Sequence, residues 1–340
     1  MTTHTLTQRP LGNTGLTVTP LGLGGAYLGR RPGPDGQATV DEEVGIATVL
    51  RALELGINLI DTSGGYMQEG RSERIIGQAL GQWFAAGGRR ETLVISTKTG
   101  TRNRQLQPEA RYSGEATRLS IESSLEALGT GYLDVALIHD PPDLDPVLAP
   151  GGAWDTLKAM KAEGLIHAIG LGVRDHAKHQ RMLETGACEV CLTHSDFNLL
   201  DQSAVEGVLK PAAAQGAGVM NGTSLYFGLL AGQNPEEVAG RVVEQWRRHP
   251  VWRTECEEKV RRATVLWQWC REWGVSLLAL NLQFCARPWF ASPDLQVAAT
   301  LMGAANPAQI EADVAAMVEE IPDAMWAELP HRLNSVPGGA

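Results

Sequence analysis

The sequence predicts a closed α/β barrel, the (β/α)8 or TIM barrel, from three observations. Eight short runs rich in Val, Ile and Leu recur along the 340 residues. Longer stretches with helical spacing separate these runs, and such alternation predicts parallel strands joined by right-handed crossovers. The runs are continuously apolar, which is typical of a sheet covered on both faces. Eight such units in about 300 residues suit a barrel better than an open doubly wound sheet.

The predicted strands are the eight apolar runs themselves. In chain order they are residues 19–25, 57–62, 92–98, 133–140, 166–173, 189–194, 216–222 and 297–303. Helical spacing is clearest over residues 41–56, 113–129 and 307–320. We expect Ser113 to cap the second of these helices and glycines to end the first two, because serine is favoured at N-caps and glycine just past helix ends.

Two segments lie outside this alternation. Residues 13–15, Asn-Thr-Gly, stand between apolar runs ahead of the first strand and predict a small β-hairpin that caps the floor of the barrel. Residues 222–275 form a long insertion after the seventh strand, and such insertions lie on the catalytic face, where they build substrate pockets. We predict one domain over residues 1–340, with a barrel core at about 8–320.

Three smaller features have structural interpretations. The segment PGPDGQ at 32–37 is expected to be a surface turn. Trp267, Trp269 and Trp273, in LWQWCREW, are expected to be structural, and Trp269 and Trp273 share one helix face because they are four residues apart. Cys188 and Cys191 form a C-x-x-C beside a predicted strand, and we interpret the pair as buried rather than redox-active or metal-binding.

Composition narrows the classes of partner. The net charge is −10, which disfavours nucleic acids and anionic membranes because both require a basic surface. The start MTTHTLTQRP lacks the apolar run of a signal peptide, and no stretch approaches the roughly 20 apolar residues of a membrane helix. Five thinly spread cysteines predict reduced thiols in a cytoplasm. A small-molecule substrate is therefore the expected partner, and assembly into a homo-oligomer stays open.

Four titratable side chains are predicted to converge at the mouth of the barrel. Asp61, Lys98 and His139 follow or end the second, third and fourth predicted strands, and Tyr66 lies five residues after Asp61. Catalytic groups of such barrels sit at the carboxyl ends of the strands. Each residue alone has an ordinary explanation, such as a salt bridge at the rim. The occurrence of all four on consecutive strand ends favours a site.

The chemistry of these groups indicates proton transfer beside a carbonyl or alcohol carbon. A tyrosine has a pKa of about 10, and lowering it by roughly three units takes about 4 kcal/mol. Lys98 can supply much of this as a nearby ammonium, and Asp61 is the carboxylate that a buried lysine needs. His139 can hydrogen-bond a substrate oxygen beside the phenol. The set contains no activated nucleophile and no cluster of metal ligands.

The motifs around these residues resemble those of the aldo-keto reductases over about residues 8–320. GINLIDTSGGYMQEGRSERIIGQAL, VISTK and LGTGYLDVALIHDPPD are similar to that family's sequence patterns. The resemblance implies a catalytic tetrad of Asp61, Tyr66, Lys98 and His139, with Tyr66 as general acid/base. It also implies a nicotinamide cofactor bound without a Rossmann fold, and the sequence has no G-x-G-x-x-G after the first strand.

The same resemblance implies cofactor-binding segments at 221–232 and 301–314. The first would clasp the pyrophosphate, and the second would hold the adenosine ribose and base. Many NADP-dependent members have a basic residue where this chain has Gly303 and Gln309, so NAD is favoured over NADP. Arg174-Asp175, His194 and Gly222 depart from the family's usual nicotinamide contacts. The candidate cofactor residues are Arg174, His194, Ser224, Leu225, Gly228, Leu230, Gly303, Ala304, Asn306, Gln309 and Asp313.

The segments GVRDH, DFNLL and VMNGTSLYFGLLAG look like the aldose 1-dehydrogenase branch, of the D-threo-aldose, L-fucose and L-galactose types. This implies oxidation of a sugar at its anomeric carbon to a lactone. The expected substrate pocket draws on Tyr27, Asp140, Trp246 and Trp252, since aromatic faces stack on sugar rings. Two alternatives stay open: an NADPH-dependent reductase of aldehydes or ketones, and a cofactor-binding regulatory subunit without activity.

Overall fold

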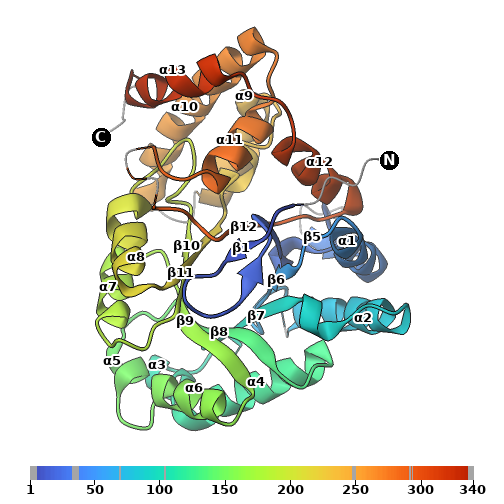
Figure 1. Cartoon of the computed structure of the whole chain (residues 1–340), viewed down its shortest axis with the longest axis vertical. Helices are drawn as coiled ribbons and strands as arrows, with labels where there is room; N and C mark the ends of the chain where they lie inside the picture. Colours follow the sequence, from blue (N-terminus) through green and yellow to red (C-terminus); the bar gives the residue numbers. More distant parts are fainter. Residues whose placement is uncertain are drawn as a thin grey trace.

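Eight parallel strands close into a barrel in the computed structural model of the chain (Figure 1). The structure describes residues 6–32, 38–68, 70–102, 105–246, 250–290, 292 and 294–335. The strands follow chain order around the barrel, and β12 pairs with β3 to close it. They are β3 (Leu21–Gly24), β6 (Leu59–Asp61), β7 (Val94–Thr99), β8 (Leu133–His139), β9 (Ile166–Gly172), β10 (Val190–His194), β11 (Gly218–Gly222) and β12 (Ala299–Met302). The predicted fold class is confirmed: each predicted run holds one barrel strand, and only β7 extends beyond its run, by one residue to Thr99.

The strands are apolar throughout because both of their faces are covered. All seven residues of β8 are buried, and its alternate side chains join two different clusters. Val135 and Leu137 belong to an inner cluster within the barrel, whereas Ala136 and Ile138 pack in the layer between strands and helices. This two-sided burial explains why the strand runs lack the apolar–polar alternation of a half-exposed sheet.

The N-terminal hairpin closes the floor of the barrel, as predicted. Its strands are β1 (Arg9–Pro10) and β2 (Thr17–Val18), joined antiparallel. Leu11 and Val18 are fully buried in the inner cluster of barrel side chains. Gly12 has a φ of 54°, and its Cα faces the backbone of Gly218 so closely that no side chain fits there. The hairpin therefore plugs the end of the barrel from which the strands start.

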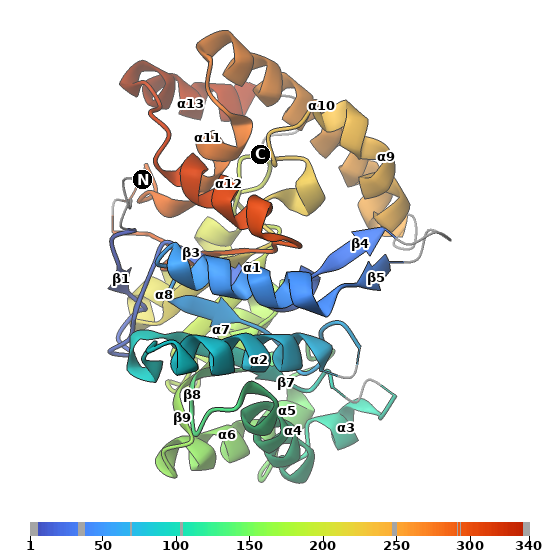
Figure 2. The same ribbon diagram turned by 90° about the vertical axis from the view of Figure 1, so that its right-hand side faces the viewer.

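A ring of helices surrounds the strands (Figures 1 and 2). Buried apolar residues of these helices pack against the strands. Ser113 caps α4 by accepting the N–H of Ala116 at 3.3 Å, and Gly129 ends that helix with a φ of 63°, both as predicted. The helices are α1 (Glu42–Glu54), α2 (Arg71–Ala85), α3 (Pro108–Arg111), α4 (Gly114–Leu128), α5 (Asp145–Leu148), α6 (Ala153–Ala162), α7 (His176–Leu183), α8 (Lys210–Gln215), α11 (Leu277–Ala286), α12 (Pro307–Met317) and α13 (Asp323–Ser335).

Additional elements gather on the opposite side from the hairpin floor. The insertion after β11 contains α9 (Pro235–Trp246) and α10 (Pro250–Trp273), which confirms its predicted position. A second hairpin, β4 (Arg30–Pro32) with β5 (Ala38–Val40), follows β3 and was not predicted. Figure 2 shows this hairpin and α9 on the side of the molecule away from β1. Residues 33–37, within the predicted turn, lie outside the described part of the chain.

The tryptophans of α10 differ in how far they are buried. Trp269 is 3% exposed and belongs to the core, as expected of a structural residue. Trp267 packs against the core from its edge, and its Nε1–H donates to the carbonyl of Gly232 at 3.2 Å. Trp273, four residues after Trp269 on the same helix, is 37% exposed.

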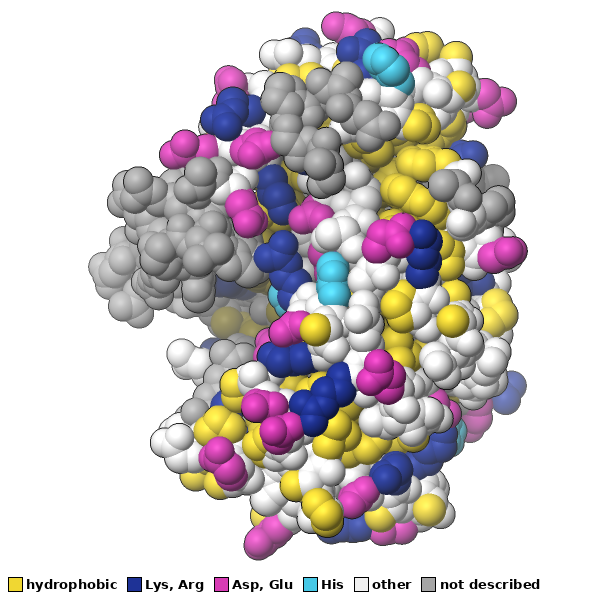
Figure 3. Space-filling view, turned by 90° about the vertical axis from the view of Figure 1, so that its left-hand side faces the viewer, with side chains coloured by type: hydrophobic (Ala, Val, Ile, Leu, Met, Phe, Trp, Pro, Cys, Tyr) yellow, Lys and Arg dark blue, Asp and Glu magenta, His cyan; other side chains and the backbone are white. Residues whose placement is uncertain are grey.

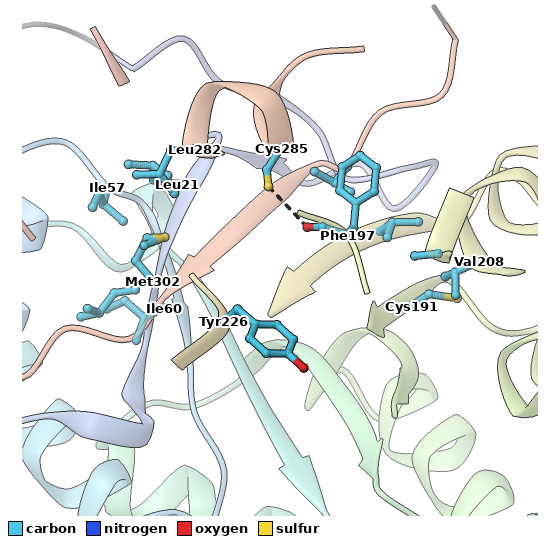
Figure 4. Packing of buried hydrophobic residues seen from close by; sticks show 14 of the residues in the cluster. Leu21, Ile57, Ile60, Cys191, Phe197, Val208, Tyr226, Leu282, Cys285 and Met302 are labelled. Carbon is cyan, nitrogen blue, oxygen red and sulfur yellow. Dashed lines mark hydrogen bonds between the residues drawn. The ribbon is translucent and has the colours of Figure 1, made fainter. Parts of the chain in front are cut away.

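The layer between barrel and helices is the larger core, and part of it is drawn in Figure 4. Residues from β3, β6, β12 and α11 meet there, and the thiol of Cys285 donates to the carbonyl of Phe197 at 3.4 Å. All five cysteines are free and buried, so the interpretation of Cys188 and Cys191 as buried residues is confirmed. The hydrogen bond with Cys188 is the largest influence on the pKa of the Cys191 thiol and raises it, and burial acts in the same direction.

Within the described part of the chain, no helix is both long enough and apolar enough to cross a bilayer. On the side of the molecule shown in Figure 3, Lys and Arg side chains are interleaved with Asp and Glu.

The fold predicts one strongly stabilising polar contact. Asp134, at the start of β8, is 3% exposed and accepts from Arg90 at 2.7 Å and from the N–H of Ile95 at 2.8 Å. Asp134→Ala would leave the N–H of Ile95 without an acceptor and the partly buried Arg90 guanidinium without its carboxylate, so we expect a loss of about 3–5 kcal/mol in the free energy of unfolding. Urea titration of the wild type and the variant measures this difference in the free energy of unfolding. Glu163→Ala breaks the solvent-exposed pair with Arg118 and should change the free energy of unfolding far less. Equal losses in the two variants would contradict the stabilising role of Asp134.

Candidate active site

Three neighbouring strands bring the predicted tetrad together at the open end of the barrel. Asp61 ends β6, Lys98 is the fifth residue of β7, and His139 ends β8. Ser96 of β7 is in register with Asp61, and Lys98 lies two residues further on, so both project to the same face. Because the strands are parallel, their carboxyl ends, and with them these side chains, lie at the same end of the barrel.

Lys98 and Asp61 form a buried ion pair. Lys98 Nζ lies 2.5 Å from Asp61 Oδ2 and 2.8 Å from the carbonyl oxygen of Thr62. The hydroxyl of Ser96 donates to the other Asp61 oxygen at 2.8 Å. Lys98 is 1% exposed and Asp61 3%. Charges this deeply buried are stable only when they are paired and hydrogen-bonded, and both conditions are met here.

Tyr66 lies on the loop between β6 and α2, above this pair. Lys98 Nζ is 4.8 Å from the centre of the Tyr66 ring. The His139 ring meets the Tyr66 ring edge-on, with centroids 5.5 Å apart and planes at 84°. Met67 and Gln68, directly after Tyr66, have φ values of 58° and 59°, a left-handed conformation that L-residues rarely adopt. Such strained backbone is common where a functional side chain is held in place.

Burial is the largest influence on the pKa of Tyr66 and raises it above its ordinary value. The Lys98 ammonium is the next influence and lowers the pKa, in the predicted direction. The Asp61 carboxylate then raises it again and weakens the effect of its partner. The expectation that Lys98 lowers the pKa is right for the lysine alone, but burial is the stronger effect.

The pKa values of Lys98 and Asp61 are also set by burial and by the contact between the two residues. Burial by itself lowers the pKa of Lys98, but Asp61 and Tyr66 outweigh it, and the pKa of Lys98 is raised. Burial also raises the pKa of Asp61, against the pull of the Lys98 ammonium. With a direct contact and the hydrogen bond from Ser96, we assign the pair as charged: an ammonium facing a carboxylate.

His139 is held by hydroxyl groups that the sequence did not single out. Its Nδ1 lies 2.8 Å from Thr101 Oγ1 and 3.1 Å from Ser63 Oγ. The hydroxyl of Tyr112 donates to the His139 carbonyl at 2.7 Å. When Nδ1 accepts from a hydroxyl, Nε2 carries the proton and can donate it to an oxygen beside Tyr66. Short hydroxyl side chains in loops give no sequence pattern, so these supports could not be predicted.

The segment after β11 makes a strained turn at the mouth. Thr223, Tyr226 and Phe227 have φ values of 53°, 45° and 57°, and Gly228 has 101°. Side chains predicted here are directed inward. The Ser224 hydroxyl faces Met302 Sδ at 3.8 Å, Leu230 is fully buried, and Leu225 packs against the core. Any contact from Ser224 and Leu230 to a cofactor would therefore be made by the backbone.

The segment after β12 lies beside that turn, because β11 and β12 are paired. Asn306 caps α12 by accepting the N–H of Gln309 at 3.2 Å, and Gln309 in turn accepts the N–H of Ala305 at 2.7 Å. Ala304 is buried in the core. Asp313, also on α12, is 5% exposed, and burial raises its pKa to about 7.

Tyr27, which the sequence predicts in the substrate pocket, lies against this segment. A side chain at Gly303 would meet the Tyr27 ring at 2.9 Å, and the N–H of Gly29 donates to the carbonyl of Ala305 at 3.0 Å. The Arg30 guanidinium lies over the Tyr27 ring at 5.4 Å. The turn after β3 thus covers the start of the segment expected to hold adenosine.

The remaining predicted residues are dispersed around the rim. Asp140 is exposed, has a φ of 42°, and places Oδ2 3.6 Å from His139 Nε2. His194 ends β10 and burial lowers its pKa. Arg174 Nη2 lies 3.7 Å from Asp201 Oδ2. The side chains of Trp246 and Trp252 lie outside the described part of the structure.

The segments at the ends of β11 and β12 suit the binding of a dinucleotide. A strained turn, a glycine-led segment and the N-terminus of α12 adjoin one another at the ends of β11 and β12. Helix N-termini attract anions such as phosphates, because their N–H groups and the helix dipole favour negative charge. Over the ranges the structure describes, no group of three His, Cys, Asp or Glu side chains could hold a metal ion.

Comparison with known proteins gives consistent results. A model described as the aldo/keto reductase family matches residues 20–331. The NADH-specific methylglyoxal reductase of Escherichia coli is 30% identical over 334 residues, covering 93% of this chain and 94% of that protein. The L-galactose dehydrogenase of Arabidopsis thaliana is 28% identical over 316 residues, covering 92% and 88%.

A solved structure from Pseudomonas aeruginosa, itself assigned to the aldo-keto reductases, is similar with a TM-score of 0.61. Its sequence is 28% identical, and the match covers 92% of this chain and 95% of that one. The resemblance inferred from the sequence motifs is therefore confirmed. The chain belongs to the aldo/keto reductase family and is an NAD(P)-dependent oxidoreductase.

Proposed function

We propose that this enzyme oxidises an aldose at its anomeric carbon to a lactone, with NAD as the preferred cofactor. The observation that carries the chemistry is the grouping of Tyr66, His139 and the buried Lys98–Asp61 pair at the barrel mouth. The similarity to an L-galactose dehydrogenase supports the sugar substrate. The complete tetrad argues against a regulatory subunit without activity.

Each residue has a role in moving one proton. Tyr66 is the general acid/base: its phenolate removes the proton of the anomeric hydroxyl as the C–H bond breaks. The nicotinamide, when bound, accepts the hydride. Lys98 stabilises the phenolate through its ammonium, and Asp61 keeps that lysine charged and oriented. His139 donates from Nε2 to the substrate oxygen and orients it toward Tyr66.

The raised pKa of Tyr66 connects the direction of reaction with pH. A buried phenol with a raised pKa stays protonated near neutral pH and is ready to donate its proton to a carbonyl oxygen. Oxidation requires the phenolate, so its rate should rise as the pH approaches the pKa of Tyr66. The same site thus supports reduction at neutral pH and oxidation in alkali.

A preference for NAD is supported by the surroundings of Gly303. A basic side chain at this position would collide with the Tyr27 ring, and Gln309 is already occupied in capping the loop. The carboxyl of Asp313 adds an acidic group to the same helix, which would oppose a 2′-phosphate when ionised. A similar protein is an NADH-specific reductase.

The second candidate function is the reduction of a small aldehyde such as methylglyoxal with NADH. The specific support is the 30% identity to a methylglyoxal reductase over nearly the whole chain. The tetrad serves both reactions, since reduction is the reverse transfer of proton and hydride. The two candidates differ in substrate rather than in catalytic groups.

Tyr66→Phe should lower kcat by about 10²–10⁴-fold, because it removes the proton-transfer group and keeps the ring. Binding of NADH, followed by fluorescence titration, should be within about threefold of wild type. An unchanged kcat would contradict the role of Tyr66.

Lys98→Met should shift the apparent pKa of oxidation upward in the pH–kcat/KM profile, because the phenolate loses the cation that lowers its pKa. The variant leaves Asp61 buried without its partner, so Lys98→Met/Asp61→Asn is the matched variant that removes this charge. Its comparison is with Asp61→Asn, which keeps the lysine. The tuning role would be refuted by an active Lys98→Met variant whose profile stays at the wild-type position, or by an active double variant whose profile stays at the position of Asp61→Asn.

Fluorescence titration with NADH and NADPH should show NADH bound at least about tenfold more tightly, a difference of about 1.4 kcal/mol. A panel of L- and D-aldoses and small aldehydes, assayed with the preferred cofactor, then separates the two candidates. Aldose oxidation supports the dehydrogenase, and turnover of methylglyoxal alone supports the reductase. Tighter binding of NADPH would overturn the cofactor assignment.

A further inference from the structure

We propose that Arg102, anchored by the buried carboxylate of Glu73, is a positioning residue that holds the Tyr66 loop against the catalytic strands. The inference rests on the proposed role of Tyr66 as general acid/base. It concerns two residues outside the tetrad, on α2 and on the loop after β7. Neither residue touches the reacting groups directly.

Glu73 is a carboxylate with an unusual degree of burial. It lies in the first turn of α2 and its side chain is 0% exposed. It accepts from Thr97 Oγ1 at 2.7 Å and from Arg102 Nη2 at 2.5 Å. Thr97 is the residue immediately before Lys98. One carboxylate therefore joins the helix that follows the Tyr66 loop to the strand that carries the catalytic lysine.

The Tyr66 loop rests directly on the residues that Glu73 holds. A side chain at Gly64 would meet Arg102 Nε at 2.8 Å, and one at Gly70 would meet Arg102 Nη1 at 3.0 Å. A side chain at Gly65 would meet Thr101 Oγ1 at 2.5 Å. The loop backbone thus approaches the guanidinium at two points, one on each side of Tyr66. Gly64 and Gly65 are needed because a side chain there would collide with Arg102 or Thr101, and not because their backbone dihedral angles are unusual.

The same short segment supports the second catalytic side chain. Thr101, next to Arg102, places its hydroxyl 2.8 Å from His139 Nδ1. At the start of the loop, Thr62 Oγ1 and Ser72 Oγ of α2 are 2.7 Å apart. The loop is therefore held at its beginning by α2 and across its middle by Arg102. Its strained residues Met67 and Gln68 need such support to stay left-handed.

The Arg102–Glu73 ion pair is more deeply buried than an ion pair on the surface of this chain. Arg118 and Glu163 also meet at 2.5 Å, but their side chains are 36% and 45% exposed. An exposed pair is screened by water and can be removed at little cost. The guanidinium of Arg102 is 21% exposed, faces a fully buried carboxylate, and lies under a catalytic loop. Arg118→Met is therefore a matched control that removes an arginine–glutamate pair without touching the site.

The first test measures kcat, KM and NADH affinity for Arg102→Met, Arg102→Lys and Arg118→Met. We expect Arg102→Met to lower kcat by about 10–100-fold, because a displacement of Tyr66 by about 1 Å is enough for that loss. NADH affinity should stay within about threefold of wild type. Arg102→Lys should restore part of kcat, since it keeps the charge on Glu73 but lacks the planar fork. Wild-type kcat in folded Arg102→Met would overturn the proposal.

The second test uses Gly64→Ala, which keeps the buried pair and so does not depend on whether Arg102→Met folds. Its methyl group should lift the loop from the guanidinium and lower kcat by itself. In the Arg102→Met background the same change should cost little more, because the obstacle is gone. Losses that simply multiply would show that loop and arginine act independently, and would refute the proposal.

Amide hydrogen exchange separates this proposal from the proposed function. We expect faster exchange over residues 62–70 in Arg102→Met and in Gly64→Ala, with exchange in α7 unchanged, and exchange over residues 62–70 in the Arg118→Met control identical to wild type. If the wild-type enzyme turned over no substrate of the panel, the proposed function would fail and exchange would still decide whether Arg102 holds the loop. Unchanged exchange in the loop of both variants would refute the positioning role.

Discussion

The mouth of the barrel depends on the ion pair between Lys98 and Asp61. Each charge is almost fully removed from water, so each is stable only while the other stays in contact. Sheet register assembles the pair, since Ser96 lies opposite Asp61 and Lys98 follows two residues later. A slip of one residue between β6 and β7 would turn Lys98 to the other face and leave Asp61 without its cation. Polar groups therefore select the register of these strands together with the apolar core.

The properties of Tyr66 follow from the same pair. An ammonium beside a phenol lowers the pKa of the phenol, but here a carboxylate 2.5 Å from that ammonium weakens the effect. Burial then decides the direction, and the pKa of Tyr66 is raised. Proton donation and proton removal become favourable in different pH ranges. The position of Tyr66 matters as much as its pKa, and it is determined by a loop whose backbone rests on neighbouring side chains.

The barrel, the floor hairpin and the convergence of the tetrad could be predicted from the sequence, because continuous apolar runs and strand-end polar residues are local patterns. The β4–β5 hairpin could not, since its strands are three residues long and carry no clear alternation. The net direction of the pKa of Tyr66 depends on burial, which is a property of the packed molecule. The inward direction of Ser224 and Leu230, and the contact of Tyr27 with Gly303, likewise arise from tertiary packing.

The order of strands has a consequence for how such an enzyme acquires new specificity. Asp61, Lys98 and His139 occupy β6, β7 and β8, whereas the segments expected to hold the dinucleotide follow β11 and β12, on the other side of β3. The long insertion with α9 and α10 follows β11, so it belongs to the same part of the barrel as the segments expected to hold the dinucleotide. Lengthening or exchanging that insertion would leave the strands that carry the proton-transfer groups unaltered. The barrel thus keeps the segments expected to bind the cofactor apart from the proton-transfer groups. The insertion is therefore the segment to exchange between related enzymes when specificity is to be changed.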